Sequence, residues 1–167
     1  MIDEVTGQKR PMKDRPRKMV VVVDDTPESK IATRFAAGRA GHIEGGGLIL
    51  FHCIRPSEFQ HWIAVADTML HEAYEAGGEL LSEIAERVFT YSGVVSEIVI
   101  VDGEPQEQLM KFMEERDDLF SITLGASNVG DPGPLIDYFS GEVAGSLKVP
   151  IIIVPGGMTL DQVDDIV

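Results

Sequence analysis

The sequence predicts an α/β fold of the doubly wound (Rossmann) type: a single five-stranded parallel sheet, strand order 3-2-1-4-5, with helices on both faces. Two observations lead to this prediction. Five short apolar runs rich in valine and isoleucine recur along the chain, as is typical of strands buried on both faces. Segments with helical spacing separate these runs, so strands and helices alternate. With 167 residues, 44% of them apolar, one domain can bury a substantial core.

The first strand is predicted at residues 19–23, MVVVV, where five apolar residues precede two aspartates. Thr26 is a candidate N-cap for the helix that follows, with Pro27 at its first position. A glycine-rich turn then leads to the second strand, LILFHCI, at residues 48–54. These elements form the first strand–helix–strand unit of the sheet.

A long helical region follows, from about Phe59 to Tyr91, because apolar residues keep helical spacing along it. Gly77 and Gly78 lie inside this region and predict a weak point or a break. The third strand, SEIVIVD, is predicted at residues 96–102.

The second half of the chain repeats the alternation. Pro105 begins a third helix, and the fourth strand is predicted at residues 119–125. A helix over about 135–147 and a fifth strand at 150–155 complete the sheet. Thr159 begins a capping-box pattern, which predicts a short final helix.

The chain is strongly acidic, with a formal net charge of −14. Residues 1–18 are basic and are expected to form a flexible tail, before a domain at 19–156 and a short C-terminal helical tail at 157–167. So acidic a body repels the nucleic-acid backbone, and we expect no nucleic-acid partner. No apolar run approaches the ~20 residues of a membrane span. A single cysteine, Cys53, and no recognisable secretory signal predict a cytoplasmic protein.

Sheets of this type bind ligands beyond the carboxyl ends of the strands, where the strand order reverses. Here that point lies between the first and fourth strands, with Asp24 and Asp25 on one side and residues 125–128 on the other. Three glycines follow the fourth strand, namely Gly125, Gly130 and Gly133. A glycine-rich turn between a strand and a helix is typical of phosphate binding.

Metal and catalytic sites have weaker support. Asp24 and Asp25 are candidates for a divalent ion, but the simpler interpretation is that Asp24 ends a strand and Asp25 caps the next helix. His52 and Cys53 are adjacent in a strand and point to opposite faces, so they cannot share an ion. No Gly-x-Ser-x-Gly elbow occurs. We therefore expect neither a metal site nor an enzyme.

The fifth strand is an apolar edge strand. Its residues are Ile151, Ile152, Ile153 and Val154. A bare apolar edge invites aggregation, so something is expected to cover it. Pairing with the same strand of a second copy would give a homodimer with two-fold symmetry, and the C-terminal helix from Thr159 is the alternative cover.

Two families share this pattern of strands. The stretch VVVDD (21–25) resembles the acidic pair of a phosphorelay receiver domain, with Asp102 in the place of the phosphoacceptor. Lys148 would supply the receiver's lysine, but it precedes the fifth strand and so lies at the opposite edge of the sheet from the phosphoacceptor. The segment between the second and third strands is also far longer than a simple receiver crossover.

The closer resemblance is to the universal stress protein family, over about residues 18–156. It rests on VVVVDDTPES, LFHCIRP, VDGEPQEQL, LGAS and SGEVAGSLKVPIIIVPG. The stretches DDTPESKIATRFAAGRA and FQHW look most like a proteobacterial subgroup of that family. The resemblance implies a homodimer through the fifth strand, and regulation under stress with protein partners that the sequence does not identify.

In the nucleotide-binding branch of that family, the resemblance implies contacts with an adenine nucleotide. Adenine and ribose would meet the end of the first strand and the residue after the second-strand histidine. Phosphates would meet a glycine after the fourth strand and a hydroxyl in the last crossover. The corresponding residues here are Val22, Val23, Asp24, Cys53, Gly125 and Ser140.

The phosphate loop departs from the family pattern. Asn128 stands where a second glycine belongs, and Asp137-Tyr138 stands in place of a Gly-Ser pair. A carboxylate against a triphosphate is repulsive by ~1 kcal/mol or more in a partly wet site. We therefore expect a non-catalytic module without tight ATP binding. The alternative is a binder of ATP or AMP, with Mg²⁺, in which Gly130 and Gly133 form a replacement cradle.

Overall fold

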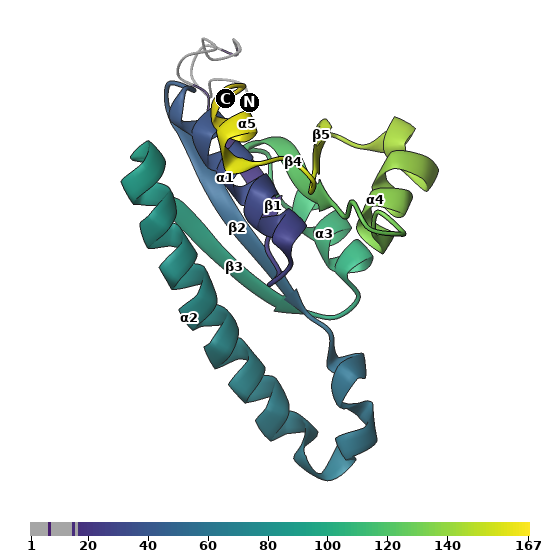
Figure 1. The fold of residues 1–167 in the computed structure, drawn as a ribbon. Coiled ribbons are helices and arrows are strands. Elements are labelled where there is room, and N and C mark those ends of the chain that lie inside the picture. Colours follow the sequence, from purple (N-terminus) through teal and green to yellow (C-terminus); the bar gives the residue numbers. More distant parts are fainter. Residues whose placement is uncertain (1–6, 8–14, 16) are drawn as a thin grey trace.

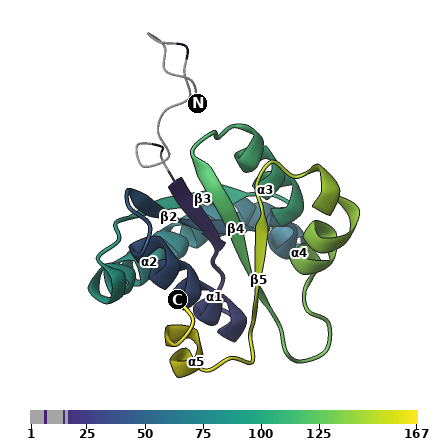
Figure 2. The same ribbon diagram turned by 90° about the horizontal axis from the view of Figure 1, so that it is seen from above.

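The structure is a computed structural model that describes residues 7, 15 and 17–167, except the side chains of residues 57–60. Five parallel strands form one sheet in the order β3-β2-β1-β4-β5, as predicted. Helices cover both faces of the sheet (Figure 1 and Figure 2). The strands are β1 (Arg17–Val22), β2 (Gly46–Ile54), β3 (Ser96–Asp102), β4 (Leu119–Ala126) and β5 (Ile151–Pro155).

The helices follow the predicted alternation with different lengths. They are α1 (Pro27–Gly41), the 3₁₀ helix η2 (Pro56–Val65), α2 (Ala66–Ser92), α3 (Pro105–Glu114), α4 (Pro134–Asp137), the π turn η3 (Tyr138–Glu142), the 3₁₀ turn η4 (Ala144–Ser146) and α5 (Leu160–Asp164). None of the described helices is both long and apolar enough to cross a bilayer.

Two apolar clusters lie on opposite sides of the sheet. Met19 and Val21 of β1 pack with α1 and α2, whereas Val20 of the same strand packs with α3 and the segment after β4. This alternation follows from the period of two in a strand. Both faces are buried, which explains why the strands read as continuous apolar runs.

Helix α1 begins at a threonine cap. The side chain of Thr26 accepts the Ser29 N–H at 3.3 Å, so the predicted cap at Thr26 is confirmed. The alternative prediction that Asp25 caps this helix is wrong, because its carboxylate instead lies 3.5 Å from Lys30 Nζ. The Asp24 carboxylate accepts the Thr26 N–H at 3.0 Å and so supports the capping residue.

The predicted break at Gly77 and Gly78 is wrong, because α2 runs without interruption through both. Gly77 is buried, and a Cβ there would lie 3.2 Å from Cδ2 of the His52 ring. Packing against the sheet thus offsets the low helix propensity of glycine. The helical region divides earlier instead, at the 3₁₀ helix η2, where Trp62 has non-helical angles (φ −119°, ψ 45°). In Figure 1, η2 and the first turns of α2 extend beyond the end of the sheet.

The predicted helix at 135–147 is also wrong as a single element, because α4, η3 and η4 replace it. Gly141 and Gly145 lie inside the segment and lower its helix propensity. The Ser140 hydroxyl donates to the Ile136 carbonyl at 2.6 Å, a bond that competes with regular helix geometry. The last crossover is therefore a short, irregular helical segment.

The final helix, α5, docks on α1 and α2. The capping box predicted at Thr159 is present. The Asp164 carboxylate accepts bonds from Arg34 Nε (2.8 Å), Arg34 Nη2 (2.7 Å) and the Tyr91 hydroxyl (2.7 Å), and Val163 is fully buried. Because α5 packs on this face, it does not cover the outer edge of β5, which among the described strands pairs only with β4.

Strands β1 and β5 lie at the two ends of the domain predicted at 19–156. β1 begins at Arg17, so it includes the last two residues of the segment assigned to the basic tail. Apart from residues 7, 15 and 17–18, that segment lies outside the described residues. At the other end, Ile153 in β5 is 41% exposed.

An ion-pair network joins the amino ends of the strands. Glu97 of β3 accepts bonds from Lys18 Nζ of β1 (2.8 Å) and Arg116 Nη1 (2.7 Å), and Arg116 also bonds to Asp118 at 2.7 Å. Hydrogen bonding to Arg116 lowers the pKa of Glu97 to about 2. The intervening strand places Gly47 opposite Lys18, and a Cβ there would lie 3.2 Å from Lys18 Cγ. Glycine at this position therefore lets the lysine cross β2.

Candidate functional site

Two adjoining hollows lie at the carboxyl ends of β1, β2 and β4, where the strand order reverses. The first, of about 480 Å³, reaches from the end of β1 to α2 and is here called the base hollow. The second, of about 230 Å³, lies between the start of α1 and the segment after β4 and is called the loop hollow. Both are lined by Val22, Asp24, Arg55 and Leu135. The predicted position of a ligand cleft therefore coincides with real space in the structure.

His52 and Cys53 take different roles in the base hollow. His52 Nδ1 lies 2.7 Å from the Val23 carbonyl and ties β2 to the end of β1. The Cys53 thiol points the other way and donates to the Gly103 carbonyl at 3.4 Å. Burial raises the pKa of Cys53 to about 11, so the thiol stays protonated near neutral pH and is a poor nucleophile.

Asp102, at the end of β3, accepts the Tyr74 hydroxyl at 2.5 Å. Burial, followed by this hydrogen bond, raises the pKa of Tyr74 to about 12. The carboxylate that would be the phosphoacceptor of a receiver domain is thus bound to a tyrosine of α2.

The loop after β4 bonds several of its own hydrogen-bond donors. Ser127 Oγ accepts the Val129 N–H at 3.2 Å, and the Asp131 carboxylate accepts the Gly133 N–H at 2.7 Å. The Ser140 hydroxyl donates within its own helical segment, as described above. The N–H groups of Ser127, Val129 and Gly133, which could bind a phosphate oxygen here, are already bonded within the loop, and Asp131 adds a negative charge.

Gly125 is required by the packing of α1. A Cβ at this position would lie 2.6 Å from the Glu28 carbonyl carbon and 3.1 Å from the Ser29 nitrogen. Gly156, after β5, approaches the same turn, because a Cβ there would lie 2.6 Å from Glu28 Cβ. The glycine at the end of β4 therefore has a structural reason that is independent of any ligand.

The structure brings some of the predicted residues together and separates others. Val22, Val23, Asp24 and Cys53 line the base hollow, and Gly125 and Gly133 line the loop hollow. Asn128 and Gly130 line neither, and the Asn128 side chain instead faces Gly157 in the turn after β5. Ser140 lines a different hollow, with Ile151 and Ile153 of β5.

Sequence reasoning missed Arg55, which lines both hollows. The signal was present in LFHCIRP, because an arginine directly after the second strand must lie at the carboxyl edge of the sheet. The family resemblance implies a ligand contact only for the residue directly after His52, which is Cys53.

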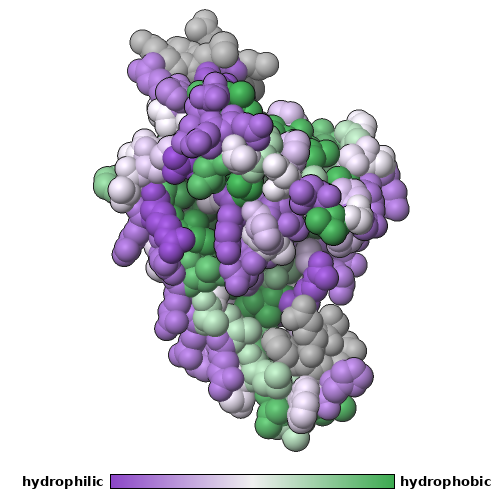
Figure 3. Space-filling view, in the orientation of Figure 1, coloured by the Kyte–Doolittle hydropathy of each residue, from purple (hydrophilic) through white to green (hydrophobic). Residues whose placement is uncertain are grey.

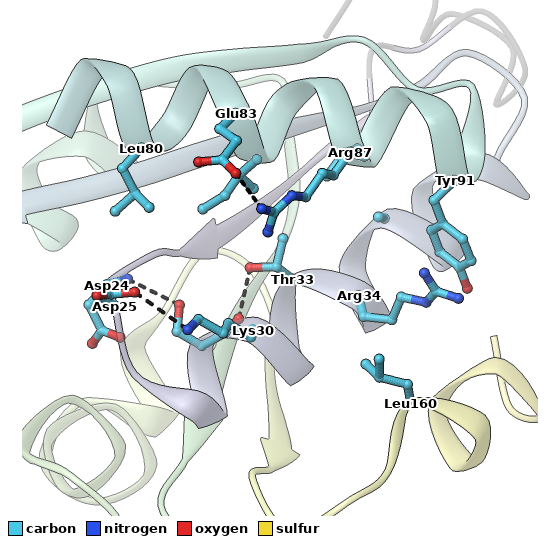
Figure 4. Close-up of a pocket in the computed structure, with 14 residues that line it drawn as sticks. Asp24, Asp25, Lys30, Thr33, Arg34, Leu80, Glu83, Arg87, Tyr91 and Leu160 are labelled. Carbon is cyan, nitrogen blue, oxygen red and sulfur yellow. Dashed lines mark hydrogen bonds and ion pairs between the residues drawn. The ribbon is translucent and has the colours of Figure 1, made fainter. Parts of the chain in front are cut away.

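A further hollow of about 340 Å³ lies between α1 and α2 (Figure 4). Its cations are paired within the chain. Lys30 lies 3.5 Å from Asp25, Arg87 contacts Glu83, and Arg34 binds Asp164 while stacking 3.4 Å from the Tyr91 ring centroid. These pairs leave none of the lysines and arginines that line this hollow free for a ligand.

The surface around the projecting segment is mixed. In Figure 3, apolar side chains appear over η2 and the start of α2, next to polar ones. Trp62 and Ile63 are 62% and 87% exposed. Within the described residues, no group of three or more histidine, cysteine or acidic side chains is arranged to hold a metal ion.

Comparison with known proteins agrees with this geometry. The sequence model of the "Universal stress protein family" matches residues 16–155. No curated protein matches the chain. A universal stress protein UspA from Lactobacillus plantarum is 17% identical, with a TM-score of 0.70 over 84% of this chain and 98% of that one.

Two similar structures are named with a nucleotide. A universal stress protein from Archaeoglobus fulgidus in complex with dAMP is 21% identical, with a TM-score of 0.52 over 85% of this chain and 98% of that one. A universal stress protein family protein from Arabidopsis thaliana with AMP bound is 16% identical, with a TM-score of 0.54 over 84% and 92%. At these identities the likeness shows the shared fold.

Proposed function

Because this chain belongs to the universal stress protein family, we propose that it is a non-catalytic, dimeric regulatory module of the stress response that does not bind ATP tightly. The stretches DDTPESKIATRFAAGRA and FQHW support its place in a proteobacterial subgroup with a degraded nucleotide-binding loop. Its protein partners would be recognised through surface contacts.

The loop after β4 is the single observation that carries this proposal. A triphosphate placed beside Gly125 would need N–H donors from the loop, but the Gly133 N–H is bonded to Asp131. It would also meet that carboxylate, together with Glu28 and Asp24, which line the loop hollow. Repulsion between like charges and the loss of internal hydrogen bonds both oppose tight ATP binding.

A ligand titration tests this proposal. Calorimetry with ATP, ADP and AMP, with and without Mg²⁺, is expected to show ATP binding no more tightly than AMP. Asp131→Ala frees the Gly133 N–H and removes a charge, so it should strengthen ATP binding by about tenfold, the effect of losing one charge repulsion and gaining one donor. ATP that co-purifies stoichiometrically with the unmodified protein, after acid extraction, would contradict the proposal.

The absence of catalysis has its own support. The Cys53 thiol and the Tyr74 hydroxyl, which bond to Gly103 and Asp102 at the end of β3, have pKa values raised to about 11 and about 12. Both groups are therefore protonated near neutral pH and unsuited to act as bases. Incubation with ATP and Mg²⁺ should yield ADP no faster than a buffer control.

The dimer would form through β5. The outer edge of this strand is unpaired among the described strands, and Ile153 is exposed there beside a hollow that Ile151 also lines. An apolar unpaired edge is a template for strand addition, and an identical strand from a second copy satisfies it symmetrically. Light scattering coupled to size exclusion is expected to give twice the chain mass.

A second candidate function is binding of an adenine nucleotide with a single phosphate. The base hollow supports it, because it combines the apolar side chains of Val22 and Leu135 with the polar Asp24 at the end of β1. Family proteins with AMP or dAMP are among the similar structures. An AMP titration without Mg²⁺ that gives saturable binding would support this candidate.

A further inference from the structure

Arg55 occupies the boundary between the base hollow and the loop hollow and lines both. The positive charge of Arg55 acts on the Cys53 thiol in the base hollow and lowers the pKa of that thiol, although burial raises the same pKa by more. If the ring and sugar of a nucleotide fill the base hollow, the phosphate attached to the sugar would lie at this boundary.

The backbone holds Arg55 in place. Pro56 follows it directly and restricts Arg55 to an extended conformation, which is observed at φ −96° and ψ 103°. The preceding carbonyl, of Ile54, accepts the Gly103 N–H at 2.9 Å and so fixes the end of β2 to the turn after β3. The base of the arginine side chain is therefore anchored on both sides, although its tip is exposed.

The guanidinium of Arg55 has no hydrogen-bond or ion-pair partner among the described residues. Five other cations are paired, at the amino ends of the strands or on the α1–α2 face: Lys18, Lys30, Arg34, Arg87 and Arg116. Among the residues that line the two hollows, Arg55 is the only lysine or arginine, while the carboxylates there are Asp24 and Glu28. In a chain of net charge −14, Arg55 is therefore the one guanidinium that the lining of the two hollows offers to an anion.

We infer that Arg55 binds the phosphate of a nucleoside monophosphate and makes the cleft selective for one phosphate over three. This inference rests on the second candidate function. A guanidinium matches a phosphate with two parallel N–H···O bonds. Arg55 would supply, from the β2 side of the cleft, hydrogen-bond donors in place of the Val129 and Gly133 N–H groups, which are bonded within the loop after β4.

Charge explains the selectivity. A nucleoside monophosphate brings a charge of about −2 at pH 7, which one guanidinium can partly neutralise. Further phosphates would extend from Arg55 into the loop hollow, where Glu28 lies, and toward the Asp131 carboxylate. Each added phosphate therefore adds repulsion without adding a cation.

Calorimetric titration of the full chain with adenosine, AMP and ATP tests the inference. Arg55→Ala is expected to weaken AMP binding by about tenfold or more, the usual effect of losing a charge-assisted pair, and to leave adenosine binding unchanged. Arg55→Lys should retain part of the AMP affinity, because it keeps the charge but loses the planar fork. Salt should reduce the difference between the wild type and Arg55→Ala.

Arg39→Ala is the matched control, since it removes the same charge from an exposed position on α1 that lines neither hollow. It should bind AMP like the wild type. Equal AMP affinity in Arg55→Ala and wild type would overturn the role of Arg55 and leave the second candidate function standing. Loss of adenosine binding in Arg55→Ala would overturn it as well, because the arginine would then hold the base or sugar. If neither adenosine nor AMP binds the wild type, the inference and the second candidate fail together.

Discussion

Substitution of glycine by alanine can be compared at two positions, Gly125, where a Cβ would meet close contacts, and Gly78, where it would meet none. Alanine at Gly125 places a methyl carbon 2.6 Å from the Glu28 carbonyl carbon. Comfortable contact between carbon atoms begins near about 3.5 Å, so α1 or β4 must move by roughly 0.9 Å. Gly156 contacts the same turn of α1 from β5, which limits how that turn can shift. Overpacking of this kind costs about 1–3 kcal/mol of unfolding free energy.

For a chain of this size, a loss of about 2 kcal/mol lowers Tm by about 4–8 °C. The measurement is thermal and urea unfolding followed by circular dichroism, without any ligand. Gly78→Ala is the matched control, because no atom lies within 4 Å of a Cβ there. Alanine should stabilise the interior of α2 by about 0.5–1 kcal/mol. A Gly125→Ala variant as stable as the wild type would refute the claim that α1 requires glycine at the end of β4.

Three further predictions concern the ion pairs and the edge strand. Glu97→Gln should cost about 1–2 kcal/mol at pH 7, allowing for partial exposure. Arg116 lowers the pKa of Glu97 to about 2, so this contribution to the unfolding free energy is complete above the unfolded pKa of about 4.3 and is lost as the pH falls through about 2. Urea titrations of the variant and the wild type should therefore give converging unfolding free energies near that pH. A difference between the two proteins that stays constant with pH would contradict the assignment. Asp164→Asn should speed amide hydrogen exchange in α5 while leaving β1 unchanged; unchanged rates in α5 would show that Arg34 does not hold this helix. Ile153→Lys should yield the mass of a single chain in light scattering, whereas a persistent dimer would place the interface elsewhere.

The topology was predictable because each buried strand carries its own signal. β3 was predicted with its observed bounds from β-branched residues and a following turn. One error arose where a tertiary contact overrides local propensity. Gly77 remains helical because it packs on His52, 25 residues earlier in the chain, and no local pattern contains that contact. Asp25 was an acceptable cap by residue type, but its neighbour Thr26 holds the position.

The site was harder to predict than the fold. Strand ends located Val22, Asp24 and Gly125 at the cleft, since parallel strands present their carboxyl ends at one edge. Spacing could not show that the Gly133 N–H is bonded to Asp131, because that bond depends on the conformation of the loop. The place of Arg55 at the same edge was predictable from LFHCIRP, but its lack of a partner among the described residues was not.

The network of Lys18, Glu97, Arg116 and Asp118 has a consequence for the cleft. It fastens β1, β3 and the turn before β4 at their amino ends, whereas both hollows lie at the carboxyl ends. The network therefore joins strands on both sides of β2 without using any residue that lines the hollows. Charge substitutions in it should change the stability of the sheet and leave the lining of the cleft as it is.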